Sequence, residues 1–568
     1  MQNNRTARDT RSIRSRRPGT ARSARSTRST RSTRSTARRS PAVISALLAT
    51  GLLLSACGSS TGSPGSGGDT STLNFAIGND PLVLNPSAVG NGNDTLYVTR
   101  QLVDSLVYQN PDTLEIQPWL AESWTVNGDA TAFTFTLRDN VTFSDGTALD
   151  AEAVKANFDD IKAAGAESSG VATLQSYSGA EVRDARTVTL NFSSPNAALL
   201  SQISSPSFGI VSPETLKIPF AERAGGDKVS GSGPYVLDNY TKDDSVTLRK
   251  RDGYAWAPPG FDTDTDGAET DTVKFTIVPE SGNRTGGLTS GQVDVAGGIA
   301  PNDIDSVAAS SQIVKRANPG TVFGLYLNTR GDLFSDPKVR QAISEAVNPT
   351  EIRDGALNDS FAVADSPLAS TTGGHRDVSS DIDVNRPDEA ARLLDEAGWR
   401  AGADGIREKD GRKLTLRITY INNFGPNPDS IALLQQQLEK IGVGSTQQTG
   451  TVPEFQNSLT SGDYDIAWRN LSGADGDILR TDFGDTGSTR NWPIPDEEIQ
   501  DLLKRQLETG DPAAREDLLG TLQTKIAESR WFIPVHELTT VLGVSDSVSG
   551  VGLGADSRLN LLVDATKQ

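Results

Sequence analysis

The sequence predicts a mixed α/β protein built from two or three packed units. Segments in which apolar and polar residues alternate, as in half-buried strands, occur along most of the chain. Between them lie segments whose apolar residues recur three and four positions apart, as in amphipathic helices. Roughly 500 residues follow an N-terminal leader, which is more than one hydrophobic core usually holds. The expected strands are 132–138, 187–192, 246–250 and 273–278, and the expected helices are 151–161, 338–347, 387–397, 429–441 and 496–509.

The leader, residues 1–56, is expected to be a signal peptide and not part of the fold. It contains 13 arginines, repeated Arg-Ser-Thr units and an apolar run over 42–56. A run of about fifteen residues is too short for a stable transmembrane helix but suits a signal-peptide core. Arg38-Arg39 leaves two export routes open, general secretion and the twin-arginine route.

Cys57 is the only cysteine of the chain, and Leu54-Ser55-Ala56 precede it directly. This arrangement resembles a bacterial lipobox, in which the cysteine thiol receives a lipid. We expect a lipid on Cys57 and a flexible Gly/Ser-rich tether over 57–71. The protein would then be held on the outer face of the cell membrane by this lipid.

Composition excludes several classes of function. The formal net charge is −19, and because the leader carries +12, the remainder carries −31. Such a body does not bind nucleic acid through its general electrostatic field. His375 and His536 are the only histidines, so no Cys/His cluster is available for zinc or nickel. The chain also has no Gly-x-Ser-x-Gly elbow between an expected strand and an expected helix and no assembled Ser/His/Asp signature, so we expect no enzyme and no cofactor. A secreted enzyme remains an alternative that a turnover assay would test.

An acidic segment over 262–273 permits two interpretations. Asp262, Asp264, Asp266 and Gly267 are spaced like the first half of a calcium loop, but the twelfth position is Val273 instead of a bidentate glutamate. A solvated acidic turn is therefore preferred to a calcium site.

Five blocks of the sequence carry a family resemblance. They occur in one order over 118–158 (PWLAESW to AEAVKANF), 231–235 (GSGPY), 328–342, 390–399 (AARLLDEAGW) and 462–465 (GDYD). Together they resemble the family 5 extracellular solute-binding proteins, the peptide/nickel-type receptors of ABC importers. The blocks have scaffold roles of their own: Gly146 suits a turn, Asp150 can cap the next helix, and Pro337 suits a first helical position.

The resemblance implies a two-lobed, type II periplasmic-binding-protein-like fold. One lobe would comprise 72–318 and 538–568, with an extra subdomain near 110–215, and the other would comprise 319–537. Strands at 322–328 and 531–537 would form a two-strand hinge. Ligand binding would favour the closed arrangement of the lobes.

The resemblance also bears on the ligand. Dipeptide-type members hold the peptide ammonium with an aspartate, and the corresponding position here is Ala474, with Leu471 in place of the family tryptophan. A buried ammonium needs an anionic partner, so this argues against a simple dipeptide unless Asp475 substitutes. The candidate ligand-binding residues are Thr95, Trp468, Arg469, Asn470, Ser472, Asp475 and Trp492. Arginine suits a carboxylate, and tryptophan offers a stacking surface.

These observations together predict a monomeric, lipid-anchored receptor. It would deliver an oligopeptide or peptide-like compound to the permease subunits of an ABC importer. The alternatives are a siderophore or oligosaccharide receptor of the same fold, and a signalling or adhesion lipoprotein without transport.

Overall fold

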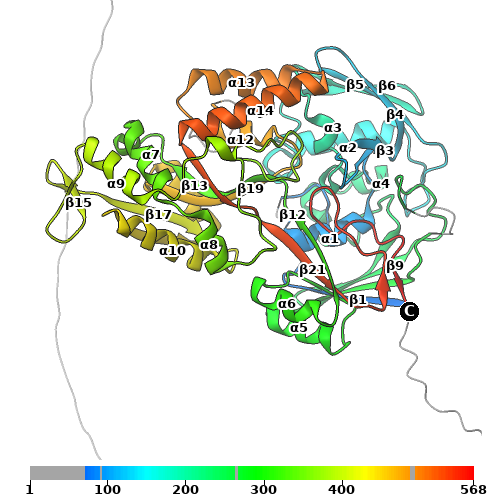
Figure 1. The fold of residues 1–568 in the computed structure, drawn as a ribbon. Coiled ribbons are helices and arrows are strands. Elements are labelled where there is room, and N and C mark those ends of the chain that lie inside the picture. The colour runs from blue at the N-terminus through cyan, green and yellow to red at the C-terminus, as the bar shows by residue number, and fades with distance from the viewer. Residues whose placement is uncertain (1–70, 90–91, 262–266, 486–492) are drawn as a thin grey trace, which may run out of the picture. The chain divides into compact units, whose positions relative to one another are not determined.

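The computed structural model describes residues 71–89, 92–261, 267–485 and 493–568. The signal peptide, Cys57, most of the tether, Trp492 and the aspartates at 262, 264 and 266 lie outside these ranges. The body from residue 71 onward contains two large β-sheets, which define the two lobes named below (Figure 1).

The first lobe is built on a seven-stranded sheet in the order β12-β21-β11-β1-β10-β9-β8. β1 runs parallel to its neighbours β10 and β11, and most other pairs are antiparallel. The strands are β1 (Thr72–Ile77), β8 (Tyr235–Thr241), β9 (Ser245–Lys250), β10 (Thr272–Ile277), β11 (Val295–Gly297), β12 (Gln312–Ala317) and β21 (Thr539–Val544). The helices of this lobe are α1 (Asn93–Leu102), α5 (Ser281–Thr289) and α6 (Ile304–Ala308).

A subdomain inserted between β1 and β8 has its own four-stranded antiparallel sheet. The sheet order is β4 (Ala121–Val126), β5 (Ala132–Leu137), β7 (Thr187–Phe192) and β6 (Tyr177–Asp184). β5 buries every second side chain, among them Phe133 and Phe135, and these cover one core with α2 (Ala151–Ala164). The Asp150 carboxylate accepts a hydrogen bond from the N–H of Ala153 at 2.9 Å, which caps α2. The smaller elements are β2 (Val107–Gln109), β3 (Ile116–Pro118), α3 (Leu199–Gln202) and α4 (Pro213–Leu216).

The second lobe is built on a five-stranded sheet in the order β18-β17-β19-β13-β20. The strands are β13 (Gly320–Leu327), β17 (Thr415–Ile421), β18 (Gly444–Gly450), β19 (Ile466–Ser472) and β20 (Phe532–His536). The helices are α7 (Pro337–Ala346), α8 (Pro349–Ala356), α9 (Pro387–Glu396), α10 (Asn427–Lys440), α11 (Val452–Ser461), α12 (Ile478–Phe483), α13 (Glu497–Glu508) and α14 (Pro512–Ser529). A small three-stranded sheet adds β14 (Arg400–Ala401), β15 (Arg407–Lys409) and β16 (Arg412–Lys413).

The chain passes twice between the two large sheets, from β12 to β13 and from β20 to β21. The crossings lie at residues 318–319, before the expected hinge strand 322–328, and at residues 537–538, at the end of the expected strand 531–537. The reason is that β13 and β20 belong wholly to the second-lobe sheet. The two crossings contact each other. The N–H of Asn318 donates to the carbonyl of Leu538 at 2.7 Å, and the Thr540 hydroxyl donates to Asn318 Oδ1 at 2.8 Å.

The four expected strands and the five expected helices are confirmed as β5, β7, β9 and β10 and as α2, α7, α9, α10 and α13. The turn glycine Gly146 has φ +83°, and Gly442, just after α10, has φ +78°. Pro337 is the first residue of α7, capped by the Asp336 carboxylate. The hydrophobic periodicity and the capping residues of the sequence were therefore sufficient to predict these strands and helices.

Candidate functional site

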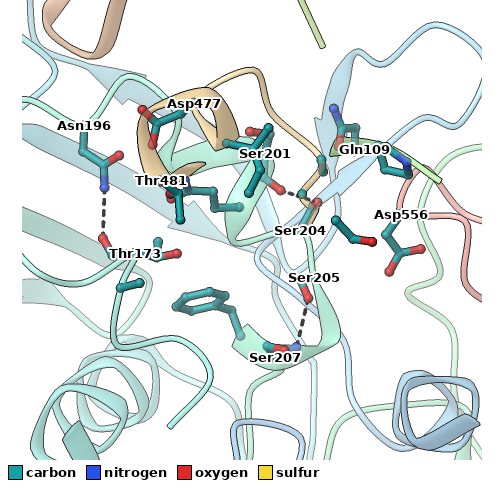
Figure 2. A pocket seen from close by; sticks show the side chains of 18 of the residues that line it. Gln109, Thr173, Asn196, Ser201, Ser204, Ser205, Ser207, Asp477, Thr481 and Asp556 are labelled. Carbon is teal, nitrogen blue, oxygen red and sulfur yellow. Dashed lines mark hydrogen bonds between the residues drawn. The ribbon is translucent and has the colours of Figure 1, made fainter. Parts of the chain in front are cut away.

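A cavity of about 1070 Å³ lies where the first lobe, its subdomain and the second lobe meet. The first lobe contributes α1 and the C-terminal segment 554–560. The subdomain contributes β2 and residues within 169–176 and 193–208, and the second lobe contributes residues within 471–481 and 504–508. Figure 2 shows Gln109 and Asp556 on one side of this cavity and Thr173 and Asn196 on the other. A ligand in this cavity would touch both lobes at once.

The lining is rich in small hydroxyl and amide groups. Nine lining residues are serines, and amide side chains come from Gln109, Gln175, Gln202, Asn196 and Asn560. Tyr108 and Phe208 are the aromatic residues among the lining residues that the structure describes. Hydroxyl and amide groups both donate and accept hydrogen bonds, so this lining suits a ligand with many polar groups.

Arg100 lies at the first-lobe end of the cavity, on α1. It is only 7% exposed, and burial lowers the pKa of its guanidinium, an effect countered by Asp556 and Asp104. Its Nη2 donates to the carbonyl of Ser204 at 2.7 Å, and its Cζ lies 5.0 Å from the ring centroid of Trp119. This end of the cavity therefore presents a buried positive charge.

The second-lobe wall contains a carboxylate, Asp477, whose charge is already compensated by protein groups. Arg480 donates to both carboxylate oxygens of Asp477, at 2.8 and 2.7 Å, and Gln506 Nε2 donates to Oδ1 at 2.6 Å. Asp477 is therefore compensated before any ligand arrives, although it lines the cavity.

Asp475 does not replace the missing ammonium anchor. Its carboxylate forms a two-point ion pair with Arg515 and accepts a hydrogen bond from the Ser201 hydroxyl at 3.0 Å. Burial alone would raise the pKa of Asp475, but the Arg515 guanidinium and the hydrogen bonds outweigh it and lower this pKa. Asp475 is thus occupied by the protein, while Ala474, at the anchor position, does line the cavity.

Two further predicted residues belong to the interior of the second lobe. Trp468 is 1% exposed, stacks against Phe323, and donates from Nε1 to Asn427 Oδ1 at 3.0 Å, so it is a core residue and offers no stacking surface to a ligand. Arg469 is an interior cation that pairs with the fully buried Asp482 and lies over the Tyr326 ring. Neither residue lines the large cavity. Alternation on β19 predicts that some of its side chains face inward, but not which of them.

The remaining candidate ligand-binding residues differ in their position relative to the cavity. Ser472 lines the cavity. Thr95 is buried on α1 and is not a lining residue, but its neighbour Leu96 is. Asn470 is half-buried on β19 away from the lining, and Trp492 lies outside the described residues. Arg100, Gln109 and Arg558 also line the cavity, and no local motif in the sequence predicts them.

Two features limit the chemistry of the described residues. No group of three or more His, Cys, Asp or Glu side chains within them is arranged to hold a metal ion. None of the helices in the described ranges is both long and apolar enough to cross a membrane.

Comparison with known families decides the class of protein. The profile of the bacterial extracellular solute-binding proteins, family 5 (middle region), matches residues 115–481. The chain belongs to this family. It is therefore a substrate-binding protein of the ABC-importer type and not an enzyme.

Relatives of this solute-binding protein span nearly the same length. The nickel-binding periplasmic protein of Escherichia coli (strain K12) is 24% identical, over 80% of this chain and 88% of that protein. The probable D,D-dipeptide-binding periplasmic protein DdpA of the same strain is 25% identical, over 83% and 89%. The glutathione-binding protein GsiB of Shigella dysenteriae is 25% identical, over 85% and 92%.

Solved structures share the fold of this solute-binding protein. NikA from Brucella suis, in complex with Fe(III)-EDTA, superposes with a TM-score of 0.75 at 24% identity, covering 88% of this chain and 100% of that one. The oligopeptide-binding protein AppA from Bacillus subtilis, in complex with a nonapeptide, gives 0.70 at 19% identity, covering 88% and 99%. The two-lobed, type II binding-protein fold follows from these likenesses.

Proposed function

We propose that this protein is a lipid-anchored receptor that captures a peptide or peptide-like compound and delivers it to an ABC-importer permease. The observation that carries the proposal is the cavity of about 1070 Å³ between the lobes. A ligand that contacts both lobes binds the closed arrangement better than the open one, and this difference is what shifts the population. The permease would then recognise the closed, loaded form.

The lining supports a peptide-like ligand over the alternatives. Peptides carry alternating N–H and C=O groups, which match the serine hydroxyls and the side-chain amides of the wall. Trp is absent from the lining residues that the structure describes, which disfavours a sugar stacked on an indole ring. His and Cys are likewise absent from that described lining, which disfavours a bare nickel ion. Relatives named for D,D-dipeptides and glutathione, and a neighbour solved with a nonapeptide, agree with this class of ligand.

Attachment to the membrane would depend on Cys57. It is the only thiol in the chain and follows a Leu-Ser-Ala sequence. We expect the full chain in the membrane fraction of a bacterial host, and the Cys57→Ala variant released from the membrane or retained as its unprocessed precursor. Metabolic labelling with a fatty-acid analogue would show lipid on the wild type alone. Lipid on the variant would reject this site.

Identification of the bound compound tests the receptor function. The protein would be purified under native conditions, its small molecules identified by mass spectrometry, and the compound titrated back by calorimetry. A peptide returned chemically unchanged supports the proposal. A sugar or a chelator would reject the peptide class, and turnover of the compound would reject the receptor function itself.

A further inference from the structure

The first-lobe end of the cavity is held together by contacts between α1 and the C-terminal segment. Gln101 Nε2 donates to the carbonyl of Asn560 at 2.9 Å, and the N–H of Leu562 donates to Gln101 Oε1 at 2.9 Å. Asn560 Nδ2 in turn donates to the Tyr108 hydroxyl at 2.9 Å, which adds β2 to the group. These contacts hold three chain segments, each bearing lining residues, in a fixed arrangement.

Arg100 has no carboxylate within ion-pair distance among the described residues. Its contacts are two neutral acceptors, Ser105 Oγ at 3.3 Å and the Ser204 carbonyl at 2.7 Å, and the face of the Trp119 ring. A guanidinium that is 7% exposed, at the wall of a cavity, has lost most of its water without gaining a direct ion pair, and Asp556 and Asp104 act on it only from beyond ion-pair distance. Burial of a charge without a direct counterion is costly, so an anion entering the cavity would relieve this cost.

Arg558 also has a hydrogen-bond donor without a partner among the described residues. Its Nη1 donates to the main-chain carbonyl of Asp556 at 2.5 Å, whereas its Nε is buried and makes no hydrogen bond to any described residue. Arg558 also lines the cavity. Unpaired buried donors are rare in folded proteins, and each one that occurs calls for a partner.

The local charges leave room for one more carboxylate. Arg100 and Arg558 line this end together with a single acid, Asp556, whose Oδ1 accepts the N–H of Arg558 at 3.0 Å. Asp104 lies behind Arg100, is fully buried, and is already engaged by Trp256 Nε1 at 2.8 Å. Two guanidinium groups therefore face one carboxylate in the cavity wall.

Gln109 adds an unpartnered acceptor to the same end. Its Nε2 donates to the carbonyl of Leu114 at 3.2 Å, which fixes the orientation of the amide. Its Oε1 is buried and has no hydrogen-bond partner in the described structure, and the side chain is only 5% exposed. Gln202 Oε1, also on the lining, is buried and unpartnered in the same way. These oxygens require N–H donors, which a simple carboxylic acid does not supply.

We infer that Arg100 and Arg558 form a carboxylate subsite and that Gln109 accepts an N–H group close to that carboxylate. This inference rests on the proposed receptor function and narrows its ligand. The chemistry that fits is a carboxylate next to an amide N–H, as at the C-terminal end of a peptide. Carboxylates of a chelator could also occupy the two arginines, but they would leave Gln109 unpaired.

The test compares free acids with amides. The full chain, extracted in detergent, would be screened by native mass spectrometry against a degenerate library of short peptides. Each peptide that binds would then be titrated in two forms, the free acid and the C-terminal amide, with citrate as a carboxylate that lacks N–H groups. We expect the acid to bind at least about tenfold more tightly than the amide, and citrate to bind weakly.

Three variants assign this preference to the subsite. Arg100→Gln and Arg558→Gln should each reduce the acid-over-amide preference about tenfold, and Arg100→Lys should keep part of it because the charge remains but the fork geometry is lost. Arg412→Gln, on the exposed strand β16, is the matched control and should change nothing. Should Arg100→Gln not fold, Arg558→Gln carries the test, because the hydrogen bond that it loses is a local one to the carbonyl of Asp556, two residues away.

The outcomes distinguish failure of the carboxylate subsite from failure of the receptor function. If acid and amide bind equally, or if both glutamine variants keep the preference, the subsite is wrong while the receptor function stands. Tight citrate binding that depends on Arg100 would keep the carboxylate subsite and reject the peptide source. If the wild type binds no peptide and no citrate, the peptide-receptor function fails, and this inference fails with it.

Discussion

The Ser201 hydroxyl of the subdomain donates a hydrogen bond of 3.0 Å to Asp475 Oδ2 of the second lobe. A second hydrogen bond joins the same two parts nearby, from the N–H of Ala197 to the carbonyl of Leu507 at 3.1 Å. Both lie beside α13 and α14, where Figure 1 shows the second lobe next to the subdomain. In this arrangement of the lobes, the subdomain and the second lobe are thus joined by direct contacts that need no ligand.

Ser201→Ala should weaken closure. The variant loses about 1 kcal/mol of hydrogen-bond energy from a contact that joins the subdomain to the second lobe, and separation of the lobes would break this contact. Ligand affinity should therefore fall roughly fivefold, mainly through faster dissociation. Energy transfer between dyes on introduced cysteines at Lys242 and Arg412, in a Cys57→Ala background, would report the closed fraction without ligand. The control is Ser335→Ala, at an exposed serine outside the cavity lining. If Ser201→Ala leaves the closed fraction unchanged, the proposed role of this contact is contradicted.

Arg515→Gln should destabilise the protein by about 3 kcal/mol, because Asp475 would remain buried without its cation. Chemical denaturation would measure the loss. Arg505→Gln, which removes an exposed ion pair with Asp501 on α13, should cost less than about 1 kcal/mol. The double variant Asp475→Asn with Arg515→Gln should be less damaged than the sum of its single variants, and strict additivity would argue against coupling.

Trp468→Phe should reduce the stability of the protein and leave its ligand affinity unchanged. It removes the hydrogen bond to Asn427 and part of a buried ring, at a cost of about 2 kcal/mol. Because Trp468 lies in the core and not on the cavity wall, calorimetry on the folded variant should give the wild-type affinity. A large loss of affinity at unchanged stability would instead place Trp468 in the binding site.

His536 should make the protein less stable in mild acid. It is fully buried on β20, and burial lowers its pKa from 6.5 to about 4. Between these two pH values the His536 imidazole is protonated in the unfolded chain but neutral in the folded protein. The contribution is therefore complete above about pH 6.5 and is lost as the pH falls toward 4, by roughly 3 kcal/mol in all.

The measurement is the difference in unfolding free energy between wild type and His536→Leu across this pH range. The difference removes opposing contributions such as that of Asp104, whose pKa burial raises to about 6 and which therefore adds stability as the pH falls. The His536→Leu curve should lack the acid-induced loss. Parallel curves would show that His536 does not titrate in this way.

Much of the fold follows from local sequence. Alternation in 132–137 and 187–192 predicts two strands of the subdomain, and Asp150 and Pro337 mark the starts of α2 and α7, because these signals act within a few residues. The cavity could not be predicted in this way. Asp475 is 274 residues from Ser201 and 40 from Arg515, and nothing near it in the sequence shows that its charge is already compensated. Arg100 and Arg558 line the same cavity only because the C-terminal segment returns to α1.

The position of β21 constrains the order in which the chain can fold. This strand, residues 539–544, lies between β11 and β12 and is the hydrogen-bonded neighbour of β12 in the described sheet. The second lobe is one continuous segment, so it can assemble as soon as it has been synthesised. The first lobe, although it comes first in the sequence, lacks a sheet strand and part of its ligand cavity until the final thirty or so residues arrive. If the chain takes the general secretion route, one of the two that its leader leaves open, it crosses the membrane unfolded. Its first lobe would then stay incomplete during synthesis and would close only after the last segment had crossed.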